Sequence, residues 1–281
     1  MIQDNFKFYS PCKLLQSYVR YYWVFKSNQP INTLTFPLGC PQIIFHKKSP
    51  LYIPELKATQ EKLTVSGQVN FSSHLYSDGD IEMIVVVFQP HAMSVFLDTP
   101  TSLFYNQEIS GYNLENKSLN ELAVRISECK DNTFCVNLIE QWLLSQITVN
   151  LYDAAHKKRL GTIEQNFKRV DAAIKSICVV PQTSVTELSS IACLSNKQFE
   201  RLFNYLVGIN PKEYARIVRF QKALGQMQNY SGERSQAQIA HSSGYADQSH
   251  FIREFKKFSG HTPVSLLKVS TPYSDLFTNP I

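Results

Sequence analysis

The sequence from Ser184 to Pro263 contains one pattern twice, and this internal repeat constrains the fold more than any other feature of the chain. The two copies are offset by 51 residues up to the pair Cys193/Gly244 and by 52 residues after it. The matched pairs are Ser184/Ser235, Glu187/Gln238, Phe199/Phe251, Arg201/Arg253, Phe203/Phe255, Gly208/Gly260 and Pro211/Pro263. Such self-similarity predicts one supersecondary unit that occurs twice.

Each copy has the local chemistry of two short helices joined by a tight turn. A Ser followed three residues later by Glu or Gln predicts a capping box, in which the two side chains satisfy free backbone N–H groups at a helix start. This spacing occurs at Ser184, Ser195 and Ser235, and Asp247 can cap a fourth helix. Two capped helices in each copy predict two helix-turn-helix units.

The second helix of each copy has one apolar face. Phenylalanines and leucines recur at helical spacing in the first copy, and phenylalanines repeat that spacing in the second. The residues of these two stripes are Phe199, Leu202, Phe203 and Leu206, and then Phe251, Phe255 and Phe258. With the stripes facing inward, the opposite faces are polar and suit DNA. Between the copies, Pro211 to Met227 predicts one long connecting helix.

The second copy carries a distinctive set of residues. They are Ile239-Ala240, Gly244-Tyr245, Asp247-Gln-Ser-His-Phe251, Arg253, Phe255-Lys256-Lys257 and Gly260-His-Thr-Pro263. Together they resemble the signature of the AraC/XylS family of transcription regulators, and the resemblance covers about residues 166–268. It implies a sequence-specific DNA-binding regulator that is not an enzyme and needs no cofactor. Its two recognition helices would enter successive major grooves of double-stranded DNA, about 34 Å apart.

The resemblance also implies which residues contact DNA. The residues implied to contact bases are Lys197, Glu200 and Arg201 in the first recognition helix and Gln248, Ser249, His250, Ile252 and Arg253 in the second. Phosphate contacts or helix caps are implied for Ser195, Asn196, Asp247, Lys256 and Lys257. Arginine suits guanine, glutamate cytosine, glutamine adenine, and isoleucine the thymine methyl group. For Arg201 and Arg253, a phosphate contact or a surface ion pair is the alternative.

Charge is unevenly distributed along the chain. Residues 151–281 contain 17 Lys and Arg against 10 Asp and Glu, while residues 1–150 contain 11 against 13. The net charge of +5 therefore combines a basic C-terminal half, at +7, with a slightly acidic N-terminal half, at −2. A basic domain is what phosphate binding requires, although any solvated helical domain can also be basic. Charge agrees with the repeat and does not establish DNA binding by itself.

The N-terminal half has a different pattern. Before Leu114, short apolar or alternating runs about ten residues apart are broken by Pro, Gly, Asn and Asp, which predicts a β-sandwich or small barrel. The runs are Tyr21–Phe25, Thr33–Phe36, Gln42–Phe45, Leu51–Ile53, Leu63–Gln68, Ser72–Tyr76 and Ile81–Phe88. After them, Leu119–Cys129 and Cys135–Ile147 predict two amphipathic helices.

The predicted fold class is a two-domain α+β protein. Residues 1–150 are expected to form a β-rich, cupin-like barrel with a helical appendage, which senses an effector or mediates dimerisation. Residues 151–165 are expected to form a linker, and residues 166–270 an all-α domain in which a long helix joins two helix-turn-helix units. Residues 271–281 are expected to form a tail.

The cupin-like expectation comes from a second resemblance. Its segments are Tyr22-Trp-Val-Phe25, Phe36-Pro-Leu-Gly39, Gln42-Ile-Ile-Phe45 and Val87-Phe-Gln-Pro-His91. They resemble the barrel that precedes the DNA-binding domain in one AraC-type subgroup, which implies a small-molecule effector or a homodimer. RNA polymerase is a further expected partner. The residues proposed for an effector pocket are Trp23, Phe36, Phe45, His46 and Phe88, with plain core as the alternative for each. The helices between Leu119 and Ile147 are expected to couple that pocket to DNA binding.

The sequence argues against several other kinds of site. His46, His74 and His91, with Glu55 and Glu82, lack the spacing of a metal-ligand pair, so no metal is expected. The six cysteines form no CxxC pair, and the chain has no phosphate loop or nucleophile elbow. Without a signal segment or a long apolar run, we expect a cytoplasmic, nucleoid-associated protein with reduced thiols and no membrane contact.

Two alternatives to a ligand-responsive regulator stay open. A DNA-repair alkyl-acceptor regulator would need a four-cysteine zinc cluster ahead of the repeat, and Cys12, Cys40, Cys129 and Cys135 are dispersed along the chain. A protein-interaction module would use the helical domain for protein contacts, and weak, salt-independent DNA binding would favour it.

Overall fold

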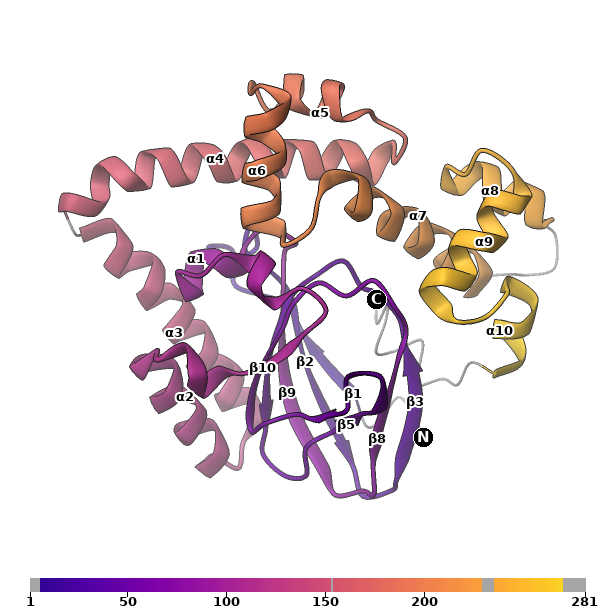
Figure 1. Ribbon diagram of the computed structural model, residues 1–281. Helices are drawn as coiled ribbons and strands as arrows, with labels where there is room; N and C mark the ends of the chain where they lie inside the picture. Colours follow the sequence, from indigo (N-terminus) through magenta and orange to yellow (C-terminus); the bar gives the residue numbers. More distant parts are fainter. Residues whose placement is uncertain (1–5, 153, 229–234, 270–281) are drawn as a thin grey trace.

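The structure, a computed structural model, describes residues 6–152, 154–228 and 235–269. Its N-terminal domain contains two antiparallel sheets, and its C-terminal domain is helical, which confirms the predicted α+β class (Figure 1). The six-stranded sheet has the order β1-β2-β9-β4-β7-β10, and the four-stranded sheet has the order β3-β8-β5-β6. The strands are β1 (Phe6–Tyr9), β2 (Val19–Ser27), β3 (Ile31–Thr35), β4 (Gln42–His46), β5 (Tyr52–Ile53), β6 (Ala58–Thr59), β7 (Leu63–Ser66), β8 (Ser73–Ser77), β9 (Ile81–Phe88) and β10 (Glu108–Ser110).

The central strands β2 and β9 are buried along most of their length because both faces of their sheet are covered. Successive side chains of a strand point to opposite faces. Trp23 and Phe25 accordingly belong to the core between the two sheets. Tyr22 and Val24 belong to a second core, under the helices that cover the other face. Those helices are α1 (Met93–Leu97), α2 (Lys117–Glu128) and α3 (Asn132–Tyr152), with the short 3-10 turns η3 (Thr101–Phe104) and η4 (Gly111–Leu114). A further 3-10 turn, η2 (Pro54–Leu56), lies beside β8 of the four-stranded sheet.

Each predicted strand run overlaps an observed strand, and three strands were missed. The missed strands are β1, β6 and β10, and all three lie at a sheet edge. An edge strand has one neighbour and is only partly covered, so its apolar alternation is weak. The two predicted helices correspond to α2 and α3.

The C-terminal domain consists of helices that match the predicted repeat. They are α4 (Ala154–Val179), α5 (Val185–Ile191), α6 (Asn196–Val207), α7 (Pro211–Gln228), α8 (Gln236–Ser243), α9 (Gln248–Ser259) and α10 (Pro263–Val269). The linker was expected at residues 151–165, and its described residues, 151–152 and 154–165, are helical instead: α3 continues to Tyr152 and α4 begins at Ala154. That stretch has no Pro and one Gly, so good helix formers dominate it. The predicted tail, 271–281, lies outside the described residues.

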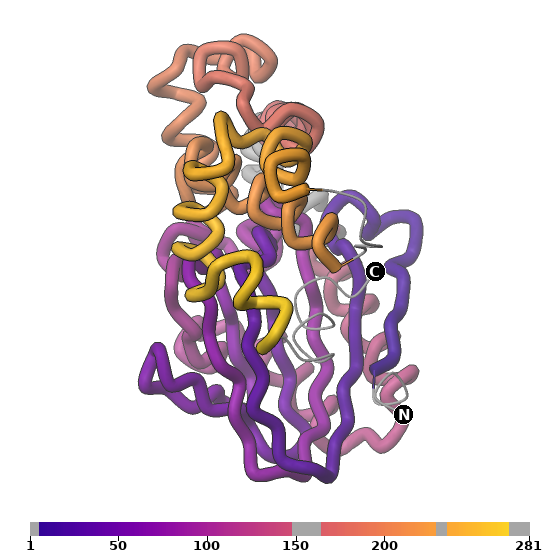
Figure 2. Tube along the Cα trace, turned by 90° about the vertical axis from the view of Figure 1, so that its right-hand side faces the viewer, coloured from indigo at the N-terminus to yellow at the C-terminus, as the bar shows by residue number. Residues whose placement is uncertain are grey.

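Helices α4 to α7 lie over one end of the β-strands, and α8 to α10 lie to the side of the β-domain (Figures 1 and 2). The contact is tight, since a Cβ added to Gly208 at the end of α6 would lie 2.9 Å from the backbone oxygen of Thr101. Leu34 and Phe36 of the N-terminal domain belong to the same apolar core as Phe220 of α7. Among the described residues, no helix is both long and apolar enough to cross a membrane.

Candidate nucleic-acid interface

Four helices of the C-terminal domain start at the side chains that the sequence indicated. Ser184, Ser195 and Ser235 each form a capping box with the residue three positions on, and both hydrogen bonds of each box are present. Asp247 caps α9 by accepting a hydrogen bond from the backbone N of His250 at 2.7 Å. Since each cap stabilises its helix by about 1 kcal/mol, both helix-turn-helix units have well-defined local structure.

The turn of each unit passes through left-handed backbone at the position where the two copies match. Cys193 has a φ of 52° and Gly244 a φ of 92°. A residue with a Cβ pays about 1 kcal/mol in this conformation, and glycine adopts it freely. A Cβ on Gly244 would also lie 2.6 Å from Nε2 of Gln182, so glycine here permits close packing as well.

Helix α6 presents the residues predicted for the first recognition helix. Phe199 and Phe203 are fully buried in the core of the domain. Lys197, Glu200 and Arg201 are exposed on the opposite side of the same helix. The three residues predicted to contact bases are therefore brought together on one accessible face.

Asn196 and Ser195, both predicted near a phosphate, lie at the start of α6. Asn196 accepts a hydrogen bond from Ser189 Oγ at 2.6 Å and lies 3.3 Å from Thr186 Oγ1. These contacts attach α5 to α6, so Asn196 helps to fix the angle between the two helices of the first unit.

Helix α9 presents most of the residues predicted for the second recognition helix. Gln248, Ser249 and Arg253 are exposed, and so are Lys256 and Lys257 in its last turn. The opposite face carries the buried residues Phe251, Phe255 and Phe258. The polar face of α9 thus resembles that of α6 in construction and carries more basic charge.

His250 and Ile252, also predicted to contact bases, are each partly buried. The His250 ring meets the Tyr245 ring edge-on at a centroid distance of 5.4 Å, and its Nε2 lies 3.7 Å from Oε2 of Glu254. Ile252 packs against the apolar core. Part of each side chain is therefore engaged within the domain, and their contacts with bases stay predictions.

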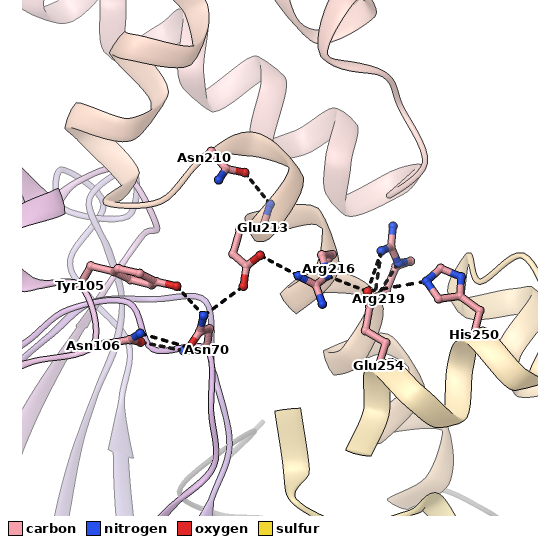
Figure 3. Close-up of polar contacts among 9 residues, drawn as sticks. All are labelled: Asn70, Tyr105, Asn106, Asn210, Glu213, Arg216, Arg219, His250 and Glu254. Atoms are coloured by element: carbon pink, nitrogen blue, oxygen red, sulfur yellow. Dashed lines mark hydrogen bonds and ion pairs between the residues drawn. The ribbon is translucent and has the colours of Figure 1, made fainter. Parts of the chain in front are cut away.

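Glu254 is a buried, charged residue of α9 that the sequence analysis missed. Its side chain is only 5% exposed and lies between two arginines of α7 (Figure 3). Arg216 Nε donates to Oε2 at 2.7 Å, and Arg219 Nη2 donates to Oε1 at 3.0 Å. The signal available in the sequence was a carboxylate placed three residues after Phe251, on the apolar side of the helix, where a charge requires partners. This ion pair fixes α9 to α7.

The polar network continues from Arg216 into the N-terminal domain. Arg216 Nη1 donates to Glu213 Oε2 at 2.9 Å, and Asn70 Nδ2 donates to Glu213 Oε1 at 3.2 Å. Asn70 also contacts Tyr105 and Asn106 (Figure 3). A continuous series of hydrogen bonds thus joins the loops of the β-domain to α9.

The five residues proposed for an effector pocket do not line one common space. Trp23 and Phe36 line a cavity between the two sheets. Phe45 and Phe88 lie on the other face of the six-stranded sheet, in the core under the helices. His46 is buried, with Nε2 2.7 Å from Gln60 Oε1, and burial lowers its pKa to about 4 against the raising effect of that hydrogen bond. Within the described parts of the chain, no three His, Cys, Asp or Glu side chains are grouped as metal ligands.

Two known families match this chain. Residues 188–268 match a family described as a helix-turn-helix domain, and residues 7–110 match a domain of unknown function, DUF6597. The fold, the repeated capped units and these matches define a DNA-binding transcription regulator with a β-rich N-terminal domain. The helix-turn-helix match covers the repeated units whose residues resemble the AraC/XylS signature.

Named relatives agree with this assignment. The chain is 26% identical over 192 residues to LumQ of Photobacterium leiognathi, named as a probable transcriptional regulator, and the match covers 68% of this chain and 73% of LumQ. It is 27% identical over 121 residues to an uncharacterized HTH-type transcriptional regulator of Haemophilus influenzae, a match that covers 40% of each chain.

Solved structures with looser likeness include ToxT from Vibrio cholerae O395, at 13% identity, with 96% of this chain and 99% of that chain covered and a TM-score of 0.43. A transcriptional regulator with an AraC-type DNA-binding domain from Chromobacterium violaceum is 21% identical, with 41% of this chain and 96% of that chain covered and a TM-score of 0.33.

Proposed function

We propose that α6 and α9 read two successive major grooves on one side of a DNA duplex. The observation that carries the proposal is their shared construction: each starts at a side-chain cap, buries two or more phenylalanines and exposes a polar face with an arginine. Arg201 and Arg253 are these arginines, and α7 connects the two units. Because successive major grooves lie about 34 Å apart, one chain could read an asymmetric site about two turns long.

Phosphate contacts supply the affinity in this proposal. Lys256 and Lys257 are exposed in the last turn of α9, and Lys197 is exposed in the first turn of α6. Each lysine that neutralises a phosphate releases a counterion, so affinity should fall steeply as salt is raised.

The test is selection of bound fragments from genomic DNA by the purified full chain, followed by a salt titration on the best site. An asymmetric sequence of about two helical turns, with a steep loss of affinity in salt, is the expected result. Recovery of nothing above background, or weak binding that salt does not change, would favour a protein-interaction module instead.

Arg253→Ala is expected to weaken binding to the selected site by about tenfold and to relax the preference at one base pair. The exposed guanidinium suits the O6 and N7 acceptors of guanine, and its removal leaves the buried face of α9 intact. The measurement is the affinity of the variant for every single-base change of the site. Arg125→Ala, an exposed arginine in α2, is the matched control and should leave affinity unchanged. An unaltered base preference in Arg253→Ala would show that the residue contacts only phosphate.

We further propose that the N-terminal domain modulates DNA binding, through two sets of contacts. The first is the hydrogen bond from Asn70 to Glu213 of α7. The second passes through α4, where the ring of His91 packs on Phe167 with a centroid distance of 4.1 Å, and α4 also packs against α3. The predicted route through the helices between Leu119 and Ile147 would use the α3–α4 contact of this second set and stays a prediction. A second copy of the chain, RNA polymerase, a cytoplasmic location and nucleoid association stay predictions.

Asn70→Ala is expected to lower the free energy of unfolding by about 1 kcal/mol, because the mostly buried Glu213 carboxylate loses a donor. Amide hydrogen exchange at the start of α7 should rise, while exchange in β2 and β9 should not. Asn32→Ala, at an exposed position of β3, is the control. Affinity of the full chain for the selected site should differ between Asn70→Ala and the control, and identical affinities would contradict coupling through this contact.

A further inference from the structure

The space between the two sheets contains a cavity of about 80 Å³. Trp23, Ile44 and Met83 of the six-stranded sheet and Leu75 of the four-stranded sheet form apolar parts of its wall. A water molecule occupies about 30 Å³ in the liquid, so a cavity of this size has room for about three of them. It can therefore hold a molecule of roughly three or four non-hydrogen atoms.

Gln68 offers this cavity a buried acceptor that has no partner. The side chain is 1% exposed, and its Nε2 donates to the backbone oxygen of Gly39 at 3.1 Å. That bond fixes the amide, yet Oε1 has no hydrogen-bond partner. An unsatisfied buried oxygen costs about 1 to 3 kcal/mol, so an occupant that donates to Oε1 would remove this cost.

Glu108 places a carboxyl group on the same cavity. Gln60 Nε2 donates to its Oε2 at 2.6 Å, and the contact of Gln60 Oε1 with His46 Nε2 at 2.7 Å fixes the orientation of Gln60. Burial raises the pKa of Glu108 to about 7, while hydrogen bonds from Gln60 and Ser66 act in the opposite direction. The carboxyl group therefore loses its proton near neutral pH, where it would attract a cation.

The other ionisable groups around the cavity do not reverse its charge. No Lys, Arg or His is among the residues that line it. The Cys40 thiol lines it, and burial raises the pKa of that thiol against the lowering effect of Arg20, whose Nη1 lies 3.8 Å from Sγ. With a neutral thiol, the charge that can develop on the wall is the negative charge of Glu108.

We propose that this cavity binds a small amine cation whose ammonium group pairs with Glu108 and whose second hydrogen-bond donor reaches Oε1 of Gln68. The carbon atoms of the amine pack against the apolar ring surfaces of Trp23 and Phe36. The faces of these rings also attract the positive charge of the amine. Anions are disfavoured, because they would meet the carboxylate and an amide oxygen. The role of this amine as an effector of DNA binding rests on the proposed function.

The cavity wall is directly connected to the contact between the domains. The backbone oxygen of Gln68 accepts a hydrogen bond from the backbone N of Asn106 at 2.8 Å. Asn106 in turn donates to the side chain of Asn70, which binds Glu213. A change at Gln68 on binding would therefore reach α7 through two further residues.

Calorimetry of the full chain at pH 8 tests the proposal with ethanolamine and ethylamine as probes and with acetate and formate as anions of similar size. We expect the two amines to bind at least tenfold more tightly than the anions and to raise Tm. Equal binding of amines and anions, or no binding of either amine at 10 mM, would mean that the cavity holds only water.

Two variants separate the site from other acidic groups. Glu108→Gln keeps the shape of the side chain and removes its charge, so amine affinity should fall at least tenfold. Glu61→Gln, at an exposed position, should leave amine affinity unchanged.

The amine affinity of the wild-type chain should also weaken from pH 8 to pH 6 as Glu108 is protonated. Amine affinity that is independent of pH, or the same in Glu108→Gln, overturns the proposal. If Glu108→Gln does not fold, the pH series on the wild-type chain and Gln68→Leu, expected to weaken binding, decide the outcome. DNA affinity without amine is measured separately, so failure of the regulator function would be distinguishable.

Discussion

Glu254→Ala is expected to lower the free energy of unfolding by about 3 kcal/mol and to weaken binding to the selected DNA site by at least tenfold. Removal of one partner from a buried ion pair typically costs about 3 to 5 kcal/mol. The lower end applies here because Arg216 and Arg219 keep 27% and 14% of their side chains exposed and can partly regain water. Without Glu254, α9 loses these ion pairs with α7, so α9 is no longer held at a fixed angle to α7.

The measurement is urea unfolding of the full chain together with DNA affinity, and Glu128→Ala at an exposed position of α2 is the control. Glu254→Gln should have an intermediate effect, since an amide oxygen still accepts from one arginine. A Glu254→Ala protein with wild-type stability and wild-type DNA affinity would rule out a positioning role for this ion pair.

Phe220→Ala is expected to cost about 4 kcal/mol of stability, because removal of a fully buried phenylalanine loses its burial and leaves a cavity. The ring lies 5.1 Å from Phe255 and 5.4 Å from Phe258 of α9, measured between centroids. It also meets Phe36 of the N-terminal domain at 6.0 Å. One side chain thus packs against both α9 and the β-domain.

Chemical unfolding and hydrogen exchange of the full chain would measure this effect. Exchange should rise in α9 and in β3, which precedes Phe36, whereas Phe134→Ala, half-exposed on α3, should change stability by less than about 1 kcal/mol. A small loss of stability with faster exchange confined to α7 would show that the two domains do not depend on this ring.

The residues that were predicted well are those whose signals are local. The capping boxes at Ser184, Ser195 and Ser235 require two side chains three positions apart, and the structure contains all three. The phenylalanine stripes depend only on helical periodicity, so the exposed faces of α6 and α9 followed from the sequence as well. The central strands were predicted because both their faces are apolar.

The residues that were missed or misplaced depend on distant partners. The structure brings Glu254 to Arg216 across 38 positions of sequence, and no short pattern contains both. Trp23 and Phe45 look alike as aromatic strand residues, yet one faces the second sheet and the other faces the helices.

The sequence by itself determined the repeated units, their caps, their buried stripes and the basic charge of the C-terminal half, because each of these is a property of neighbouring residues. Only the tertiary structure decided which face of the β-domain holds a cavity, which carboxylate is buried between arginines, and how Asn70 meets Glu213. Those contacts exist only once chain segments far apart in sequence are packed together, since burial is what gives an isolated charge or an unpaired amide oxygen its energetic cost.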